Sequence, residues 1–459
     1  LFMVLKLYNT LGRKKQVFLP ISTGKIGLYG CGPTVYWYQH IGNMRRYVFE
    51  DILKRVLLFN GFKVKHIINI TDVGHLTSDL DQGEDKMVKA IKREGLSLSK
   101  ESLLKIADKY TQAFFKDIKK LNILEPDKWP KATNHINEMI EVIEKIEKNG
   151  FAYKTDVGLI FDTSKFKDYS KLANLKVENL KAGSRVSIDE GRKNPTDFAL
   201  WITNQPNHIM QWDSPWGRGF PGWHIECSAM SSKYLGEQFD IHTGGEEHIP
   251  VHHTNEIAQS QAAFNKKPWV KYWLHMRWLT VKGEKMAKSK GSLYTLTDLE
   301  EKGFPPMTFR YLCLSAHYRT QLDFSLKNLE NAKNTYERLK NILRNVKDDK
   351  TINKDYLKDF ENAVNDDLNT PEALQVLWRF LRDDKAKGKF QTIKKMDEVF
   401  GLNLLEKKEI KIPEKIKDLI NKREKSRTNK EWYKADELRN KINELGYKID
   451  DTKDGVRVS

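Results

Sequence analysis

The stretch KIGLYGCGPTVYWYQHIGN, residues 25–43, determines the fold that we expect for this chain. It contains a strand pattern, a glycine-rich turn and then HIGN at residues 40–43, which begins an apolar helical run to about residue 59. This order places small residues and the His40 imidazole at a helix N-terminus, where backbone N–H groups and the helix dipole favour phosphate. The stretch therefore predicts an α/β fold with a phosphate site at the start of the helix.

A second stretch, KMAKS at residues 285–289, is a glycine-flanked loop that carries Lys285 and Lys288. Alone it is also compatible with an ordinary solvated lysine loop. HIGN followed by KMAKS in this order resembles the two signature motifs of class I aminoacyl-tRNA synthetases. The resemblance implies that His40, Gly42, Asn43 and Lys288 bind ATP.

Longer motifs narrow the resemblance to the cysteinyl-tRNA synthetases. They are YGCGPTVY at 29–36, NITD at 69–72, PGWHIECSAM at 221–230, FDIH at 239–242, PVHHTNE at 250–256, EIAQS at 256–260 and DDLNTPEA at 366–373. These motifs are spread over nearly the whole chain. The family's fold is therefore expected: a class I Rossmann-like nucleotide-binding domain with an insertion, followed by a helical bundle and a small C-terminal α+β domain.

The domain boundaries follow from changes of pattern along the chain. Residues 1–120 alternate strand and helix and form the first half of the catalytic fold, and residues 121–215 form a connective insertion. We expect residues 216–325 to form the second half with the KMAKS loop and residues 326–405 the helical bundle, and the resemblance implies that residues 406–459 form an anticodon-binding domain. A chain of 459 residues is long enough for several domains.

Several individual elements are also predicted. The patterns indicate strands at 1–8, 64–70 and 238–242, a hairpin at 151–161, and a terminal strand pair at 447–450 and 456–458. They indicate helices at 136–148, 326–346, 357–365 and 371–382. The strand at 64–70 ends at Thr71, and ligands of open α/β sheets bind at that edge, although a plain strand end is the alternative.

The resemblance implies a zinc site formed by Cys31, Cys227, His252 and Glu256, with one Zn²⁺ per chain. Two cysteines, a histidine and a glutamate can complete a tetrahedral zinc shell. From the residues alone, Cys227 is equally compatible with a buried small apolar side chain. The four-residue spacing of His252 and Glu256 puts both on one helix face, which suits joint ligation and also an ordinary surface pair.

Zinc would explain how the enzyme distinguishes cysteine from serine. A pocket that selects by size gives only about 1–3 kcal/mol of discrimination, whereas soft sulfur suits zinc better than a hydroxyl does. The resemblance implies that Thr71, Trp223 and His242 shape the amino-acid pocket, with ordinary packing as the alternative for each.

The same resemblance implies catalysis by positioning and charge stabilisation, with His40, Lys285 and Lys288 as the catalytic residues and Mg²⁺ bound with ATP. The chain departs from the class pattern at two positions. Asn43 replaces the second histidine of the first motif, and Ala287 replaces the serine of the second. Asparagine can donate a hydrogen bond but carries no charge.

Composition and charge favour a polyanionic partner. The net charge is +17, which a lysine-rich proteome or a tRNA partner would each explain. Residues 407–434 hold 11 Lys/Arg against 5 Asp/Glu. Arg427, Trp432, Asp436 and Arg439 are the implied anticodon-binding residues. The alternative is a charged amphipathic helix whose Trp432 packs inward.

We therefore expect a cysteine–tRNA ligase with tRNA(Cys), ATP and L-cysteine as partners. One rival is an ATP-dependent ligase that joins cysteine to an amino-sugar, but such paralogues lack the C-terminal tRNA domain. Another is a non-catalytic RNA-binding paralogue, which would be expected to lose motif lysines or zinc ligands. We expect no membrane span, because no apolar run of about 18 residues exists. Three cysteines suit a reducing cytoplasm, and a monomer is expected.

Overall fold

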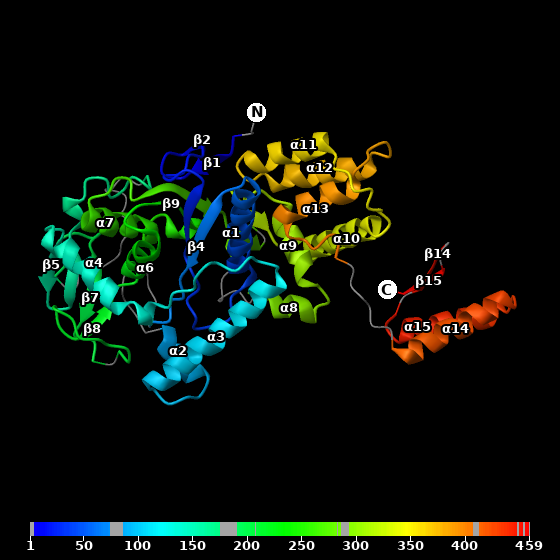
Figure 1. The fold of residues 1–459 in the computed structure, drawn as a ribbon. Coiled ribbons are helices and arrows are strands. Elements are labelled where there is room, and N and C mark those ends of the chain that lie inside the picture. The colour runs from blue at the N-terminus through cyan, green and yellow to red at the C-terminus, as the bar shows by residue number, and fades with distance from the viewer. Residues whose placement is uncertain are drawn as a thin grey trace. The chain divides into compact units, whose positions relative to one another are not determined.

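The computed structural model describes residues 4–73, 86–174, 191–206, 208–281, 283–285, 293–406, 413–447, 449–452 and 455–458. The chain forms two compact units, Leu1–Leu404 and Leu405–Ser459 (Figure 1). Unit 1 contains the sheets and most of the helices, and unit 2 contains two helices and a short hairpin. None of the described helices combines the length and apolar character needed to cross a membrane.

A parallel four-stranded sheet forms the centre of unit 1. Its order is β10 (Val270–Met276), β9 (Phe239–Gly245), β3 (Lys25–Gly30) and β4 (Lys63–Ile68). The helix α1 (Ile41–Phe59) connects β3 to β4. It is buried around most of its circumference, because it contacts the sheet as well as helices α9 (Pro306–Leu314) and α13 (Lys389–Phe400). The predicted strands and the helix after HIGN are confirmed.

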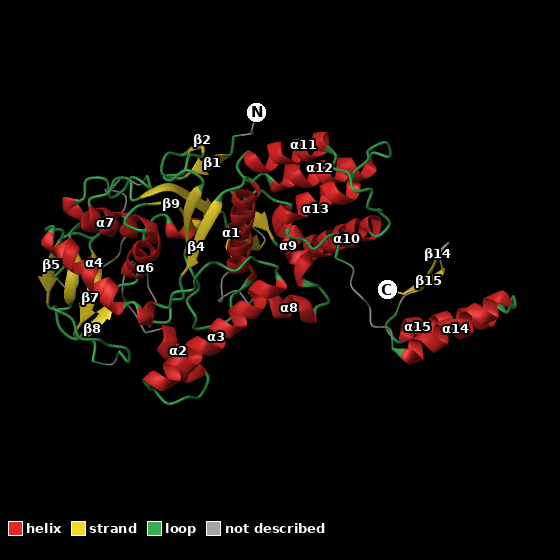
Figure 2. Ribbon diagram, in the orientation of Figure 1, coloured by secondary structure: helices red, strands yellow, loops and turns green. Residues whose placement is uncertain are grey.

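An antiparallel sheet covers another part of unit 1. It joins β5 (Ala152–Thr155), β6 (Gly158–Phe161), β7 (Phe198–Thr203) and β8 (Gly219–Pro221). Figure 2 shows these strands on the side of unit 1 away from the helical bundle. The predicted helix at 136–148 and hairpin at 151–161 are confirmed as α4 (Ile136–Lys148) and the β5–β6 pair. β8 lies beyond residue 215, where we expected the insertion to end.

Two helices, α6 (Ile225–Leu235) and α7 (His252–Phe264), pack beside these sheets. The helix α6 contacts α4, β3 and β4, and α7 contacts α4 and α6. Many of their side chains belong to one apolar core that also includes Tyr29, Trp201 and Trp269. Both helices are therefore fixed in position by packing on several sides.

Smaller elements complete the part of unit 1 outside the helical bundle. The strands β1 (Lys6–Asn9) and β2 (Lys14–Val17) form a hairpin, so the predicted first strand is confirmed in its second half. The helices α2 (Lys86–Arg93) and α3 (Lys100–Lys120) contact each other. A short sheet contains β12 (Glu284–Lys285), β11 (Leu279–Val281) and β13 (Leu322–Asp323), and α8 (Leu296–Glu301) follows.

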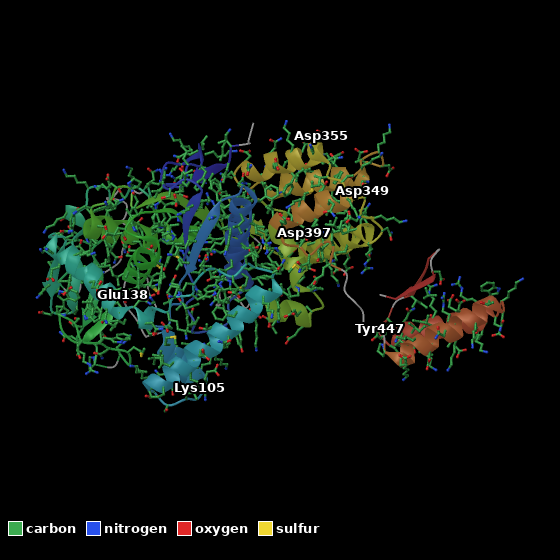
Figure 3. All side chains as sticks on the ribbon, in the orientation of Figure 1. Lys105, Glu138, Asp349, Asp355, Asp397 and Tyr447 are labelled. Carbon is green, nitrogen blue, oxygen red and sulfur yellow. The ribbon has the colours of Figure 1, made fainter. Side chains whose placement is uncertain are left out.

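The helical bundle consists of α10 (Leu326–Leu343), α11 (Lys354–Asn365), α12 (Thr370–Arg382) and α13, and the three helices predicted here are confirmed. Arg310 of α9 links it to α1 through a buried ion pair with Asp51 and a hydrogen bond to α13. Arg310 Nη2 donates to Asp51 Oδ2 at 2.5 Å, and Arg310 Nε donates to Phe400 O at 2.8 Å. Asp397, labelled in Figure 3, accepts from the backbone N–H groups of Leu402 and Leu404. The bundle is thus linked to α1 by the buried hydrogen bonds of Arg310.

Unit 2 is a small α+β unit. Its elements are α14 (Glu414–Thr428), α15 (Trp432–Glu444) and the antiparallel strands β14 (Ile449–Thr452) and β15 (Gly455–Val458). The core is Ile416, Ile442 and Ile449, and Tyr447 packs against it (Figure 3). The predicted terminal strand pair is confirmed.

Candidate metal centre and active-site cavity

A cavity of about 240 Å³ lies at the carboxyl ends of β3, β4 and β9. This is the edge at which open α/β sheets bind ligands. The turn after β3 approaches the end of β4 closely, because a Cβ on Gly32 would lie 1.4 Å from the carbonyl oxygen of Asn69. The cavity is lined by Cys31, Gly32, Pro33, Thr34, Tyr36, Trp37, Tyr38, Gln39, His40, Asn43, Arg46, Asn69, Thr71, Trp223, Cys227, Glu247, His248, His252 and Leu293.

The four predicted metal ligands meet at the inner side of this cavity. Cys31 follows β3, Cys227 lies in the first turns of α6, and His252 and Glu256 lie one turn apart on α7. One ligand atom from each lies within 4.8 Å of all the others. His252 Nε2 is 3.6 Å from Cys227 Sγ and 2.9 Å from Glu256 Oε1. Residues distant in sequence thus form a set of two sulfurs, a nitrogen and an oxygen.

The chemistry of this cluster fits a metal. Glu256 is fully buried, and no contact to its Oε1 among the described residues has good hydrogen-bond geometry, although His252 Nε2 lies 2.9 Å away. Burial alone would raise the pKa of Glu256, but His242 and His252 lower it to about 2. Burial also raises the pKa of the Cys31 thiol. A buried carboxylate oxygen without a well-aligned donor is costly unless a cation accompanies it, and binding of that cation would release thiol protons.

A second group of possible metal ligands shares Cys31 and Glu256 with the first and lies farther from the cavity. Cys31 and Glu256 also lie within 4.8 Å of the ring nitrogens of His242 and His253. His253 Nε2 is 3.1 Å from Cys31 Sγ, and its Nδ1 is 2.7 Å from His275 Nε2. Neither His242 nor His253 lines the cavity. The first set is therefore the one that a substrate could reach, and His253 is a neighbour that sequence reasoning missed despite the His252–His253 pair.

The predicted amino-acid pocket residues fall into two groups. Thr71 and Trp223 line the cavity. Thr71 Oγ1 donates to Glu226 Oε2 at 2.8 Å, and the Trp223 ring stacks on His252 with centroids 4.3 Å apart. His242 instead lies behind Glu256, with its Nε2 2.7 Å from Glu256 Oε2 and no exposed surface. Its position is suited to orienting the Glu256 carboxylate as a metal ligand and not to contacting a substrate.

Two residues of the first motif, His40 and Asn43, also line the cavity. His40 is the N-cap of α1, and its Nδ1 accepts from the Asn43 backbone N–H at 3.3 Å. Asn43 Nδ2 donates to Gln39 Oε1 at 2.7 Å, so the amide that replaces the class histidine ties the turn to the helix. Gly42 lies in the first turn of α1.

The segment after the lysine loop, which contains Tyr294 and Thr295, lies beside the N-terminus of α1. Ile41 N donates to Tyr294 O at 2.8 Å, and His40 forms a β-bridge with Thr295. Lys285 lies in β12. Lys288 and Ala287 lie outside the described residues. The flanks of the second motif are thus close to the first, although the predicted roles of its lysines stay predictions.

Arg46 is a cavity residue that sequence reasoning missed. It lies on α1 and is buried, and it donates to the backbone oxygen of Cys31 and to Tyr47 Oη. Its carboxylate partner is Glu50. Burial raises the pKa of Glu50 to about 7, although the charge of Arg46 opposes this shift. A positive charge is thereby held between the metal ligands and the helix N-terminus. Its spacing of three residues from Asn43, which also lines the cavity, could have indicated the same helix face.

The four residues predicted to bind the anticodon lie in unit 2. Trp432 has 59% of its surface exposed, so the alternative in which it packs inward is wrong. Asp436 is also exposed. Arg427 forms an ion pair with Asp451, and Arg439 Nη2 donates to Ile449 O at 3.2 Å. The two arginines therefore tie α14 and α15 to the hairpin, while Trp432 and Asp436 point to solvent.

Comparisons with known proteins agree with this geometry. Residues 17–334 match the family model described as the tRNA synthetases class I (C) catalytic domain. The chain is 47% identical to cysteine–tRNA ligase 1 of Burkholderia lata over 462 residues, which cover 99% of this chain and 97% of that protein. It is 48% identical to the cysteine–tRNA ligase of Treponema denticola over 488 residues, covering 98% of each.

A solved structure supports the fold. Methionyl-tRNA synthetase of Mycobacterium tuberculosis bound by methionyl-adenylate superposes with a TM-score of 0.57. The match covers 82% of this chain and 88% of that one, at 13% sequence identity.

Proposed function

The chain belongs to the cysteinyl-tRNA synthetases, a class I aminoacyl-tRNA synthetase family, and from this premise we propose a mechanism for its activity as a cysteine–tRNA ligase. Cysteine is activated with ATP to cysteinyl-adenylate and is then transferred to the 3′ end of tRNA(Cys). The observation that carries the proposal is the opening of the Cys31, Cys227 and His252 cluster into the cavity that begins at the HIGN helix.

Zinc is the metal that suits this cluster, because thiolate, imidazole and carboxylate are all common zinc ligands. Cys31, Cys227, His252 and Glu256 would hold it, and the bound ion would select the substrate thiol over the serine hydroxyl. Thr71 and Trp223 would line the space beside the ion. His242 would fix the orientation of the Glu256 carboxylate from behind through the 2.7 Å contact.

Activation requires charge stabilisation more than covalent catalysis. The cysteine carboxylate attacks the α-phosphorus of ATP, and pyrophosphate leaves. His40 and the N-terminus of α1, with Gly42 and Asn43, would bind the phosphates, and Mg²⁺ would accompany ATP. Lys285 and Lys288 would neutralise charge on the departing pyrophosphate. Arg46 adds a buried positive charge beside the Cys31 backbone.

The second step is transfer to tRNA. The ribose hydroxyl of the terminal adenosine attacks the carbonyl carbon of the adenylate, the bond from that carbon to the phosphate oxygen breaks, and AMP leaves. The hydroxyl proton passes to a phosphate oxygen or to water. The structure assigns no side chain to that proton, so positioning is the contribution of the protein in this step.

The rival reactions fit less well. A cysteine–amino-sugar ligase would not need the bundle and unit 2, whereas the cysteine–tRNA ligases compared above match 98–99% of this chain. A non-catalytic paralogue would not need four converging metal ligands. We propose that unit 2 reads the anticodon through Trp432 and Asp436, with Arg427 and Arg439 fixing the surface. We also propose a cytoplasmic monomer.

The test combines two assays. Purified protein is assayed for cysteine-dependent ATP–pyrophosphate exchange and then for charging of total tRNA, with serine in place of cysteine as the control. Exchange and charging with cysteine alone support the proposal. Exchange without charging would favour a cysteine ligase with another acceptor, and failure of both in metal-loaded protein would refute the function.

A further inference from the structure

A group of aromatic rings borders the cavity at the turn between β3 and α1. Trp37 and Tyr38 line the cavity, and 42% of the Tyr38 surface is exposed. The Tyr38 ring meets the ring of Tyr110 edge-on, with centroids 5.0 Å apart. Tyr110 lies on α3 and is buried, so it supports Tyr38 from below. Tyr38 thus presents an aromatic ring where the cavity meets solvent.

The supporting contacts hold this ring in place before any ligand binds. The Arg93 guanidinium lies 3.6 Å from the centroid of the Trp37 ring, and its Nη2 donates to Tyr36 O at 2.8 Å. Tyr110 Oη donates to Glu94 Oε1 at 2.5 Å. Arg93 and Glu94 stand at the C-terminal end of α2, so three segments of the chain fix the position of Tyr38. A preorganised ring loses little freedom when a flat ligand stacks on it.

The charge around the rings suits a nucleic-acid strand. Residues 86–120, which contain α2 and α3, hold ten lysines and arginines against four acidic residues. Lys105, labelled in Figure 3, extends from α3. Such a segment attracts phosphates without regard to sequence, and an aromatic ring beside it offers a stacking surface for an unpaired base.

On the basis of the proposed function, we propose that Tyr38, supported by Trp37 and Tyr110, is the stacking surface for the base of the terminal adenosine of tRNA. In the transfer step the ribose hydroxyl of that nucleotide must reach the adenylate carbonyl inside the cavity. Its base is attached to the same ribose and must therefore lie at the edge of the cavity. Tyr38 is the half-exposed ring at that edge. The adenine of ATP has the same chemistry, so the experiment separates the two sources.

The first test compares three variants, Tyr38→Ala, Tyr38→Phe and Leu104→Ala. Leu104 is an exposed apolar side chain of α3 and is a matched control for loss of surface area. Transfer from preformed enzyme-bound adenylate to subsaturating tRNA should slow about five- to hundredfold in Tyr38→Ala. The other two variants should transfer as the wild type does, and ATP–pyrophosphate exchange should be unchanged in all three. An equal fall in exchange would assign the ring to ATP and overturn the proposal, as would unchanged transfer in Tyr38→Ala.

The second test removes the base instead of the ring. A tRNA whose terminal nucleotide keeps its ribose but lacks its base should transfer more slowly with the wild type, and Tyr38→Ala should add no further loss. Such non-additivity is the mark of a direct contact. Additive losses would overturn the stacking proposal. Failure of the wild type to charge intact tRNA would instead refute the proposed function, so the two outcomes are distinguishable.

Discussion

The metal cluster of unit 1 and the surface of unit 2 hold their candidate functional residues in opposite ways. Cys227 and Glu256 are buried, and the four ligand side chains of the cluster come together from three segments of the chain. Trp432 and its neighbour Tyr433 are 59% and 88% exposed and lie outside the apolar core of unit 2. A change in the cluster should therefore affect several groups together. A change at Trp432 should remove one contact with a partner and leave the fold alone.

The largest effect is expected for Cys227→Ser. A hydroxyl is a poor zinc ligand, so we expect loss of the bound metal and a fall in cysteine activation of about a thousandfold or more. This exceeds the 10- to 100-fold cost of losing a group that only contacts a metal ligand. Metal analysis measures zinc occupancy, and ATP–pyrophosphate exchange measures cysteine activation. The matched control is Cys313→Ser, because Cys313 is also buried and unpaired but lies in α9 away from the cluster. Full metal occupancy in Cys227→Ser would contradict the assignment.

A somewhat smaller effect is expected for Lys288→Ala, at the second lysine of KMAKS. Loss of one group that stabilises charge in a transition state costs about a hundredfold in rate. Exchange and charging should fall together, while the dissociation constant for cysteine changes little. Pre-steady-state activation rates measure this. If the rate of adenylate formation is unchanged, Lys288 is an ordinary solvated loop residue.

A third change tests the support behind the cluster. His242→Ala removes the contact to Glu256 Oε2 but keeps all four proposed zinc ligands, Cys31, Cys227, His252 and Glu256. We expect metal affinity to fall about 10- to 100-fold, as for other outer partners of metal ligands. Competition with a chelator measures it. His66→Ala is the control, since His66 is an equally buried histidine on β4. Equal affinities in the two variants would show that His242 only fills space.

These two regions also show how much of the candidate site could be predicted from the sequence. The helix after HIGN and the shared face of His252 and Glu256 follow from local pattern, so both could be predicted. The placement of His242 behind Glu256, and of His253 beside Cys31, could not. Those contacts depend on β9 pairing with β3, and strand neighbours are set by packing over the whole sheet and not by local periodicity. Exposure of Trp432 was likewise undecided, because an amphipathic helix allows an aromatic residue at its N-terminus to face either way.

Trp432→Ala is the smallest change and the most selective one. Trp432 is the first residue of α15, and 59% of its surface is exposed. Its removal should alter the free energy of unfolding by no more than about 0.5 kcal/mol, as for other surface substitutions. Loss of a stacked base should lower charging efficiency about five- to hundredfold. Cysteine-dependent exchange should stay unchanged, because the metal cluster and the HIGN helix belong to unit 1.

The control for this variant is Leu445→Ala, which removes a second exposed apolar side chain at the other end of the same helix. Charging, exchange and melting temperature are measured on the same preparations of both variants. Equal charging by Trp432→Ala and the wild type would remove Trp432 from the anticodon surface. A parallel fall in exchange would show that unit 2 acts on the catalytic unit itself, and the separation of the two regions argued from burial would then be wrong. A fall in charging alone, confined to Trp432→Ala, is the outcome that an exposed base-stacking ring requires.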